Sequence, residues 1–180
     1  MSSARVFQVA LVDRVHPAPD YFGPSTKNEV TYTIFDYLIQ ISRASSQKFI
    51  PGPGWSYRAA HVQPHDVVVY FVLDRSNSVA RKKFGVEPPA GAGGGFTYFN
   101  GAVTVCEVYV EGSMPAHRLA NVAFHEVMHN KLEMGNEMHT LGGVAASPTP
   151  ERAILTAESI RRMSARLFRA VPQYTKAMLE

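Results

Sequence analysis

Residues 66–74 read Asp-Val-Val-Val-Tyr-Phe-Val-Leu-Asp, a continuous apolar run between two aspartates. Uninterrupted β-branched and aromatic residues predict a strand that is buried on both faces, as in a sheet covered by helices on each side. A shorter apolar stretch at residues 6–12 predicts a second buried strand. The centre of the fold is therefore expected to be a sheet.

Three segments around these strands have the apolar spacing of helices. Residues 28–47 place apolar side chains at steps of three and four, which predicts a long amphipathic helix. A second helix is predicted from about 116 to 134, with Gly135 as the residue that ends it. A third is predicted over about 150–168.

Turn residues punctuate the chain between these elements. The repeated proline and glycine at 51–54 predict a loop over 49–58. Residues 91–95 are rich in glycine, and the aromatic stretch 96–99 that follows predicts a short strand. The pair Asn100-Gly101 then predicts a tight hairpin turn into a strand over 102–110. We expect one α+β domain over residues 1–180, with a mixed twisted sheet, a long N-terminal helix, a central helix and a C-terminal helix.

Composition limits the classes of function. The chain has 180 residues, 46% hydrophobic and 18% charged, with a net charge of +3, so a nucleic-acid partner is not expected. A single cysteine, Cys106, excludes an internal disulfide framework. No apolar run is long enough for a membrane helix. Gln8 and Asp13 interrupt the apolar N-terminal stretch, so we expect a cytoplasmic protein or export without an N-terminal signal peptide.

The central helix carries the motif His-Glu-Val-Met-His at residues 125–129. Histidines four residues apart lie on one helical face, so His125 and His129 can both reach one zinc ion. Glu126 beside the first histidine can take a proton from a water on that ion. The sequence thus predicts His125 and His129 as metal ligands and Glu126 as a catalytic base.

A catalytic zinc site usually has three protein ligands. His139 is the first candidate for the third, because the chain after Gly135 is long enough to double back toward the metal. Glu158 on the last helix is the second candidate. The sequence does not decide between them.

The motif at 125–129, followed by Gly135 and His139, resembles the zincin metallopeptidases and more specifically their metzincin branch. In that branch the active-site helix ends at a glycine three residues after the second histidine, and the third histidine follows three residues after that glycine. Here Gly135 comes six residues after His129, and His139 comes four residues after Gly135. The resemblance implies a zincin-like fold, a Zn²⁺ cofactor and a polypeptide substrate.

Zincins pair an extended substrate with an edge strand above the metal. The resemblance therefore implies that Gly95, Phe96, Thr97 and Tyr98 bind substrate through their main chain. The alternative is an ordinary sheet strand after a glycine-rich connector.

Two other functions stay open. The scaffold could bind metal and a partner without proteolysis. The chain could instead bind an acidic partner or nucleic acid through the basic residues of its last helix, which are Arg161, Arg162, Arg166 and Arg169. The oligomeric state does not follow from the sequence.

Overall fold

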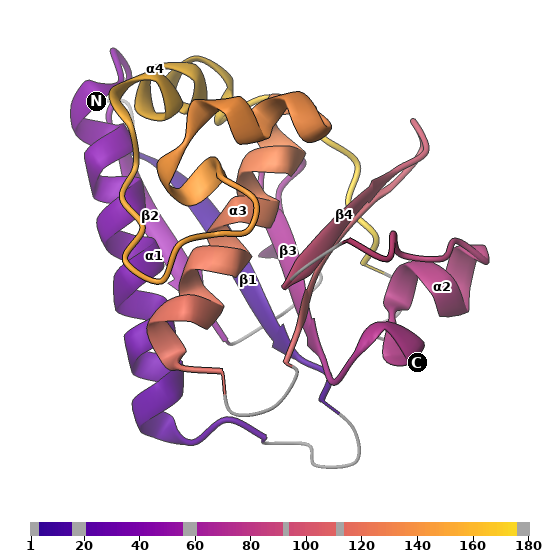
Figure 1. Ribbon diagram of the computed structural model, residues 1–180. Coiled ribbons are helices and arrows are strands. Elements are labelled where there is room, and N and C mark those ends of the chain that lie inside the picture. The colour runs from indigo at the N-terminus through magenta and orange to yellow at the C-terminus, as the bar shows by residue number, and fades with distance from the viewer. Residues whose placement is uncertain (1–3, 16–20, 56–60, 92–93, 111–113, 176–180) are drawn as a thin grey trace.

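The computed structural model describes residues 4–15, 21–55, 61–91, 94–110 and 114–175. In this part of the chain five strands form one mixed sheet in the order β2-β1-β3-β5-β4 (Figure 1). Four strands are parallel and β4 is antiparallel to β5, at one edge. The strands are β1 (Arg5–Asp13), β2 (Phe49–Gly54), β3 (Val67–Val72), β4 (Gly95–Phe99) and β5 (Thr104–Tyr109).

Helices cover both faces of this sheet. One face packs against three helices, α1 (Pro24–Ala44), α3 (Ala116–Leu132) and α4 (Ala157–Arg166) (Figure 1). The other face packs against α2 (Val79–Phe84) and Tyr174 near the C-terminus. The predicted α+β architecture with a mixed sheet is therefore confirmed.

The strand predicted over 66–74 is the central strand β3. Val67, Val69 and Phe71 belong to the apolar cluster beneath α1 and α3. The alternate residues Val68, Tyr70 and Val72 belong to the cluster beneath α2. All six are buried, because successive side chains of a strand point to opposite faces and both faces are covered.

The loop predicted at 49–58 is wrong over its first half, because residues 49–54 form β2 in parallel register with β1. Pro51 and Pro53 are two residues apart, so their ring nitrogens lie on the same side of the strand. β2 is an edge strand, and a proline is accepted there because one side needs no hydrogen-bond donor.

Helix boundaries also differ from expectation. α1 begins at Pro24 rather than 28, since a proline suits the first helical position. α3 ends at Leu132, and Glu133, not Gly135, is the left-handed residue that closes it, with φ of 50°. α4 begins only at Ala157, where the Thr156 hydroxyl accepts a hydrogen bond from the Ser159 amide at 3.1 Å.

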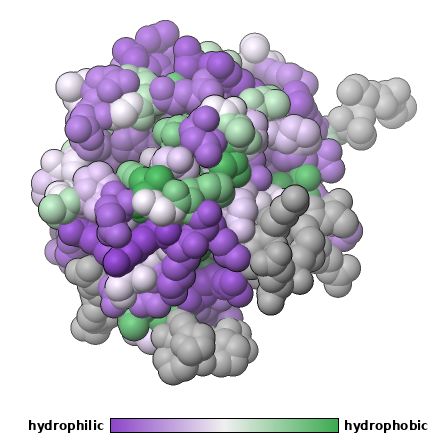
Figure 2. Space-filling view, turned by 90° about the vertical axis from the view of Figure 1, so that its right-hand side faces the viewer, coloured by the Kyte–Doolittle hydropathy of each residue, from purple (hydrophilic) through white to green (hydrophobic). Residues whose placement is uncertain are grey.

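The hairpin prediction is confirmed. β4 and β5 pair antiparallel, but the turn is one residue later than expected: the Asn100 amide donates to the Val103 carbonyl at 3.3 Å, so Gly101, with φ of +81°, and Ala102 are its central residues. β5 accordingly begins at Thr104 rather than at 102. The short helix α2 was not expected, although Ser78 before it and the left-handed Gly85 after it are ordinary cap residues. On the side that carries α2 and β4, hydrophobic residues gather in the middle of a mainly hydrophilic surface (Figure 2).

Among the described residues, no helix combines the length and the hydropathy that a membrane crossing requires.

Candidate metal centre

Two histidines of the motif come from the buried helix α3, which lies beside α1 on one face of the sheet. The helix is fixed by polar contacts as well as by apolar packing. The Tyr37 hydroxyl donates to Asn121 Oδ1 at 2.7 Å. The fully buried Lys131 ammonium donates to the carbonyls of His65 and Arg169 at 2.6 and 2.9 Å. These bonds anchor α3 on both sides of the motif, so the motif side chains project from a rigid element.

His139 reaches the same place from a different segment. The left-handed Glu133 turns the chain at the end of α3, and its carboxylate pairs with Arg169 at 2.6 Å. The chain then returns through the 3-10 helix Asn136–Leu141, which carries His139. The His139 side chain is thereby brought back over the last turns of α3.

The three histidines form a tight cluster. The Nε2 atoms of His125 and His129 are 3.0 Å apart, and those of His129 and His139 are 3.3 Å apart. All three ligand atoms lie within 4.8 Å of one another. Nitrogen ligands about 2.1 Å from a tetrahedral ion are separated by roughly 3.4 Å. The spacing of this cluster is therefore that of three ligands around one metal.

Hydrogen bonds to the backbone fix how two of these rings are protonated. His125 Nδ1 lies 2.8 Å from the Val144 carbonyl, and His129 Nδ1 lies 2.7 Å from the Met134 carbonyl. A carbonyl can only accept, so each Nδ1 carries the proton and each Nε2 presents a lone pair. Two lone pairs 3.0 Å apart repel each other. A cation between them removes that repulsion, and backbone carbonyls at Nδ1 are the usual outer partners of metal-ligating histidines.

Burial keeps these imidazoles neutral. It lowers the pKa of His125 to about 3, with the neighbouring His129 as a further cause. Burial also lowers the pKa of His129 and of His139. Metal ligands must be deprotonated, so at neutral pH no proton has to leave the three rings before a metal binds. The residues present fit a metal ion that accepts imidazole ligands.

Glu126 is buried where α3 packs against β4. The Thr97 hydroxyl donates to Glu126 Oε2 at 2.6 Å. Gly95 leaves room for the other oxygen, because a Cβ at that position would lie 2.5 Å from Oε1. Burial raises the pKa of Glu126 to about 8; the Thr97 hydrogen bond opposes this and the charge of Glu107 adds to it.

A cleft of about 600 Å³ runs between β4 and the segment 134–149, with α3 as its floor. The histidine cluster and Glu126 open into this cleft. Gly95, Phe96 and Thr97 lie along it on the edge strand β4. Tyr98 does not line it, because its side chain packs against Phe84 on the other face of the sheet, with the ring centres 5.6 Å apart.

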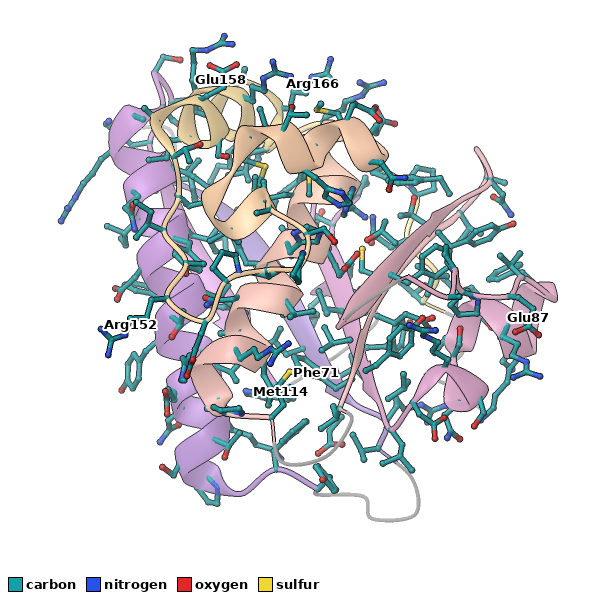
Figure 3. The ribbon with its side chains drawn as sticks, in the orientation of Figure 1. Phe71, Glu87, Met114, Arg152, Glu158 and Arg166 are labelled. Atoms are coloured by element: carbon teal, nitrogen blue, oxygen red, sulfur yellow. The ribbon has the colours of Figure 1, made fainter. Side chains whose placement is uncertain are left out.

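Glu158 is not brought into the cluster. It lies on α4 (Figure 3), where its carboxylate binds Arg161 and Arg162 at 2.6 Å. These hydrogen bonds lower its pKa to about 2. Among the described residues His139 is the third donor that joins His125 and His129.

The basic residues of the last helix are engaged within the chain. Besides the two arginines on Glu158, Arg166 donates to the Leu132 carbonyl at 2.8 Å and Arg169 pairs with Glu133. Each of these four arginines therefore has a partner within the described part of the chain.

Some contributors to the site were missed in the sequence. The Val144 and Met134 carbonyls orient the histidines through backbone atoms, which leave no residue-type signal. Arg118 lines the cleft, and its place seven residues before His125 puts it on the same helical face, a spacing that could have been noticed.

Comparisons with protein families, with curated proteins and with solved structures find no significant match to this chain.

Proposed function

We propose that this chain is a zinc-dependent metallopeptidase with a zincin-like fold. The observation that carries the proposal is the convergence of three histidine Nε2 atoms beside a buried glutamate in an open cleft. The motif at residues 125–129 supports it, because it provides two ligands and a base on one helical face. The edge strand along the cleft supports a polypeptide substrate.

Each residue has a defined task in this proposal. His125, His129 and His139 would hold the metal. A zinc ion there supplies a water of lowered pKa and a Lewis acid for the scissile carbonyl. Glu126 accepts a proton from the attacking water at Oε1, and it later delivers that proton to the nitrogen of the leaving amine.

The position of the Glu126 carboxylate depends on Thr97, and its protonation depends on burial and on the charge of a bound metal. The Thr97 hydrogen bond occupies Oε2, and Oε1 lies beside Gly95 without a hydrogen bond from Thr97. Because burial raises its pKa to about 8, the carboxyl is protonated at neutral pH when no cation is near. A neighbouring positive charge lowers a carboxyl pKa, so a bound metal ion would shift Glu126 toward the deprotonated form that can act as a base.

The experiment compares wild type, Glu126→Gln and the control Glu87→Gln, an exposed glutamate beside α2 (Figure 3). Metal content is measured by mass spectrometry, and cleavage is measured on unfolded casein. We expect one zinc per chain in all three proteins, and cleavage at least about 100-fold slower in Glu126→Gln alone. Zinc binding without any cleavage by wild type would refute the peptidase and favour a metal-binding module. Absence of zinc binding would refute both.

A further inference from the structure

Arg118 stands out among the residues that line the cleft. The cleft is otherwise lined mainly by neutral, small and apolar residues, together with the three histidines and the buried Glu126. Arg118 is the one lysine or arginine among the described residues that line it. Its side chain is exposed, so the guanidinium is available to a ligand.

The charge of Arg118 is not neutralised within the described part of the chain, where no carboxylate lies within 4 Å of it. Its neighbour His117 differs, since it lies 3.9 Å from Glu29 and 3.4 Å from Glu151. A guanidinium presents a planar fork of donors that matches a carboxylate, so the partner that best complements Arg118 is a carboxylate.

The packing of β4 on α3 tells which end of a bound peptide meets Arg118. A Cβ on Gly94 would touch Val122, and Gly95 and Thr97 approach Glu126 further along the helix. β4 and α3 therefore run in the same direction along the cleft. An extended peptide that pairs antiparallel with β4, the more stable arrangement, runs in the opposite direction. Its C-terminal part then lies toward Val122 and Arg118.

The distance along the helix gives the position of the contact. Arg118 precedes His125 by seven residues, which is roughly 10 Å along the axis of an α-helix. An extended peptide advances about 3.4 Å per residue, so this distance corresponds to about three residues. Arginine side chains on helices lean toward the N-terminus, which also directs Arg118 away from the metal.

We propose that Arg118 binds a carboxylate of the substrate about three residues to the C-terminal side of the scissile bond. This inference rests on the proposed peptidase function and specifies its substrate class. The carboxylate is supplied either by an aspartate or glutamate side chain or by the free C-terminus of a short peptide. Both present the same chemistry to the guanidinium.

The test compares wild type, Arg118→Gln and the control Arg152→Gln, an arginine that points away from the body of the molecule beside α1 (Figure 3). The zinc-loaded proteins cleave a peptide library, and cleavage sites are identified by mass spectrometry. We expect wild type and Arg152→Gln to favour sites with a carboxylate two to four residues downstream, about fivefold over sites without one. In Arg118→Gln that ratio should fall to about one. Synthetic peptides ending in a free acid or an amide then separate the chain end from a side chain.

A binding measurement makes the outcome independent of turnover. In the Glu126→Gln background, zinc-loaded protein should bind a downstream-Glu peptide about fivefold more tightly than its Gln counterpart, and Arg118→Gln should remove the difference. A downstream preference that survives in Arg118→Gln, or a preference on the upstream side, would overturn the proposal. If wild type cleaves nothing, the peptidase proposal fails, while the binding ratio still decides the role of Arg118.

Discussion

Replacing Gly95 by alanine would place a methyl group against the carboxylate of Glu126. The added Cβ would lie 2.5 Å from Glu126 Oε1, about 0.9 Å inside the 3.4 Å at which ordinary contact begins. It would also lie 2.8 Å from the Glu107 carbonyl oxygen. That carbonyl is held in the β4–β5 ladder, where Phe96 pairs with Glu107, so the backbone at residue 95 has to shift as well as the carboxylate.

The expected magnitude follows from this displacement. A shift of about 1 Å breaks the 2.6 Å hydrogen bond from Thr97 and overpacks a closed site, which costs about 1–3 kcal/mol of unfolding free energy. For a chain of this length, each kcal/mol lowers the melting temperature by roughly 2–4 °C. Misplacing a catalytic group by about 1 Å slows a reaction about 100-fold. Zinc affinity should stay within about threefold of wild type, since the three atoms nearest the added Cβ belong to Glu126 and Glu107.

Thermal unfolding, zinc competition and casein cleavage are measured on Gly95→Ala and on the control Gly54→Ala. A Cβ on Gly54, also a strand glycine, meets nothing within 4 Å. The control should keep the wild-type values in all three assays. If Gly95→Ala were as stable and as active as wild type, Glu126 would not be confined as described and the reasoning would be refuted.

Two further predictions concern the metal and a buried charge. His139→Ala should weaken zinc binding at least about 100-fold in competition with a chromogenic chelator, whereas His117→Ala on the same helix should not; equal affinities would exclude His139 as a ligand. Burial lowers the pKa of Lys131 to about 8 from 10.5. Between pH 8 and pH 10.5 the unfolded chain therefore binds more protons than the folded chain. The unfolding free energy should rise with pH over this range, by about 3 kcal/mol in total. Denaturant titrations of Lys131→Met should show no such rise of the unfolding free energy with pH. If the variant showed the same rise as wild type, the rise would not come from protonation of this lysine.

Much of the architecture follows from local sequence patterns. The continuous apolar run of β3 requires cover on both faces, and the turn signal at Asn100-Gly101 predicts the hairpin of β4 and β5, although the observed register is one residue later. β2 could not be predicted in the same way, because Pro51 and Pro53 are compatible with a strand only at an edge. Whether a strand lies at the edge of a sheet depends on residues far away in the chain, so local composition does not predict it.

Part of the candidate site also follows from local sequence, and part depends on distant contacts. The four-residue spacing of His125 and His129 places both rings on one helical face, so periodicity alone brings them together. His139 joins them through the left-handed turn at Glu133, where a glycine was expected two residues later. That turn forms at a glutamate whose carboxylate is held by Arg169, a residue beyond α4.

The sequence by itself determined the sheet core, the central helix and two histidines with their glutamate, because each depends on the period of an α-helix or a strand. Only the tertiary structure decided the third histidine, the enclosure of Glu126 by Thr97 and Gly95, and the place of Arg118 in the cleft. Those features join β4, α3 and the segment after it. Contacts between segments distant in sequence arise from packing, which no local periodicity encodes.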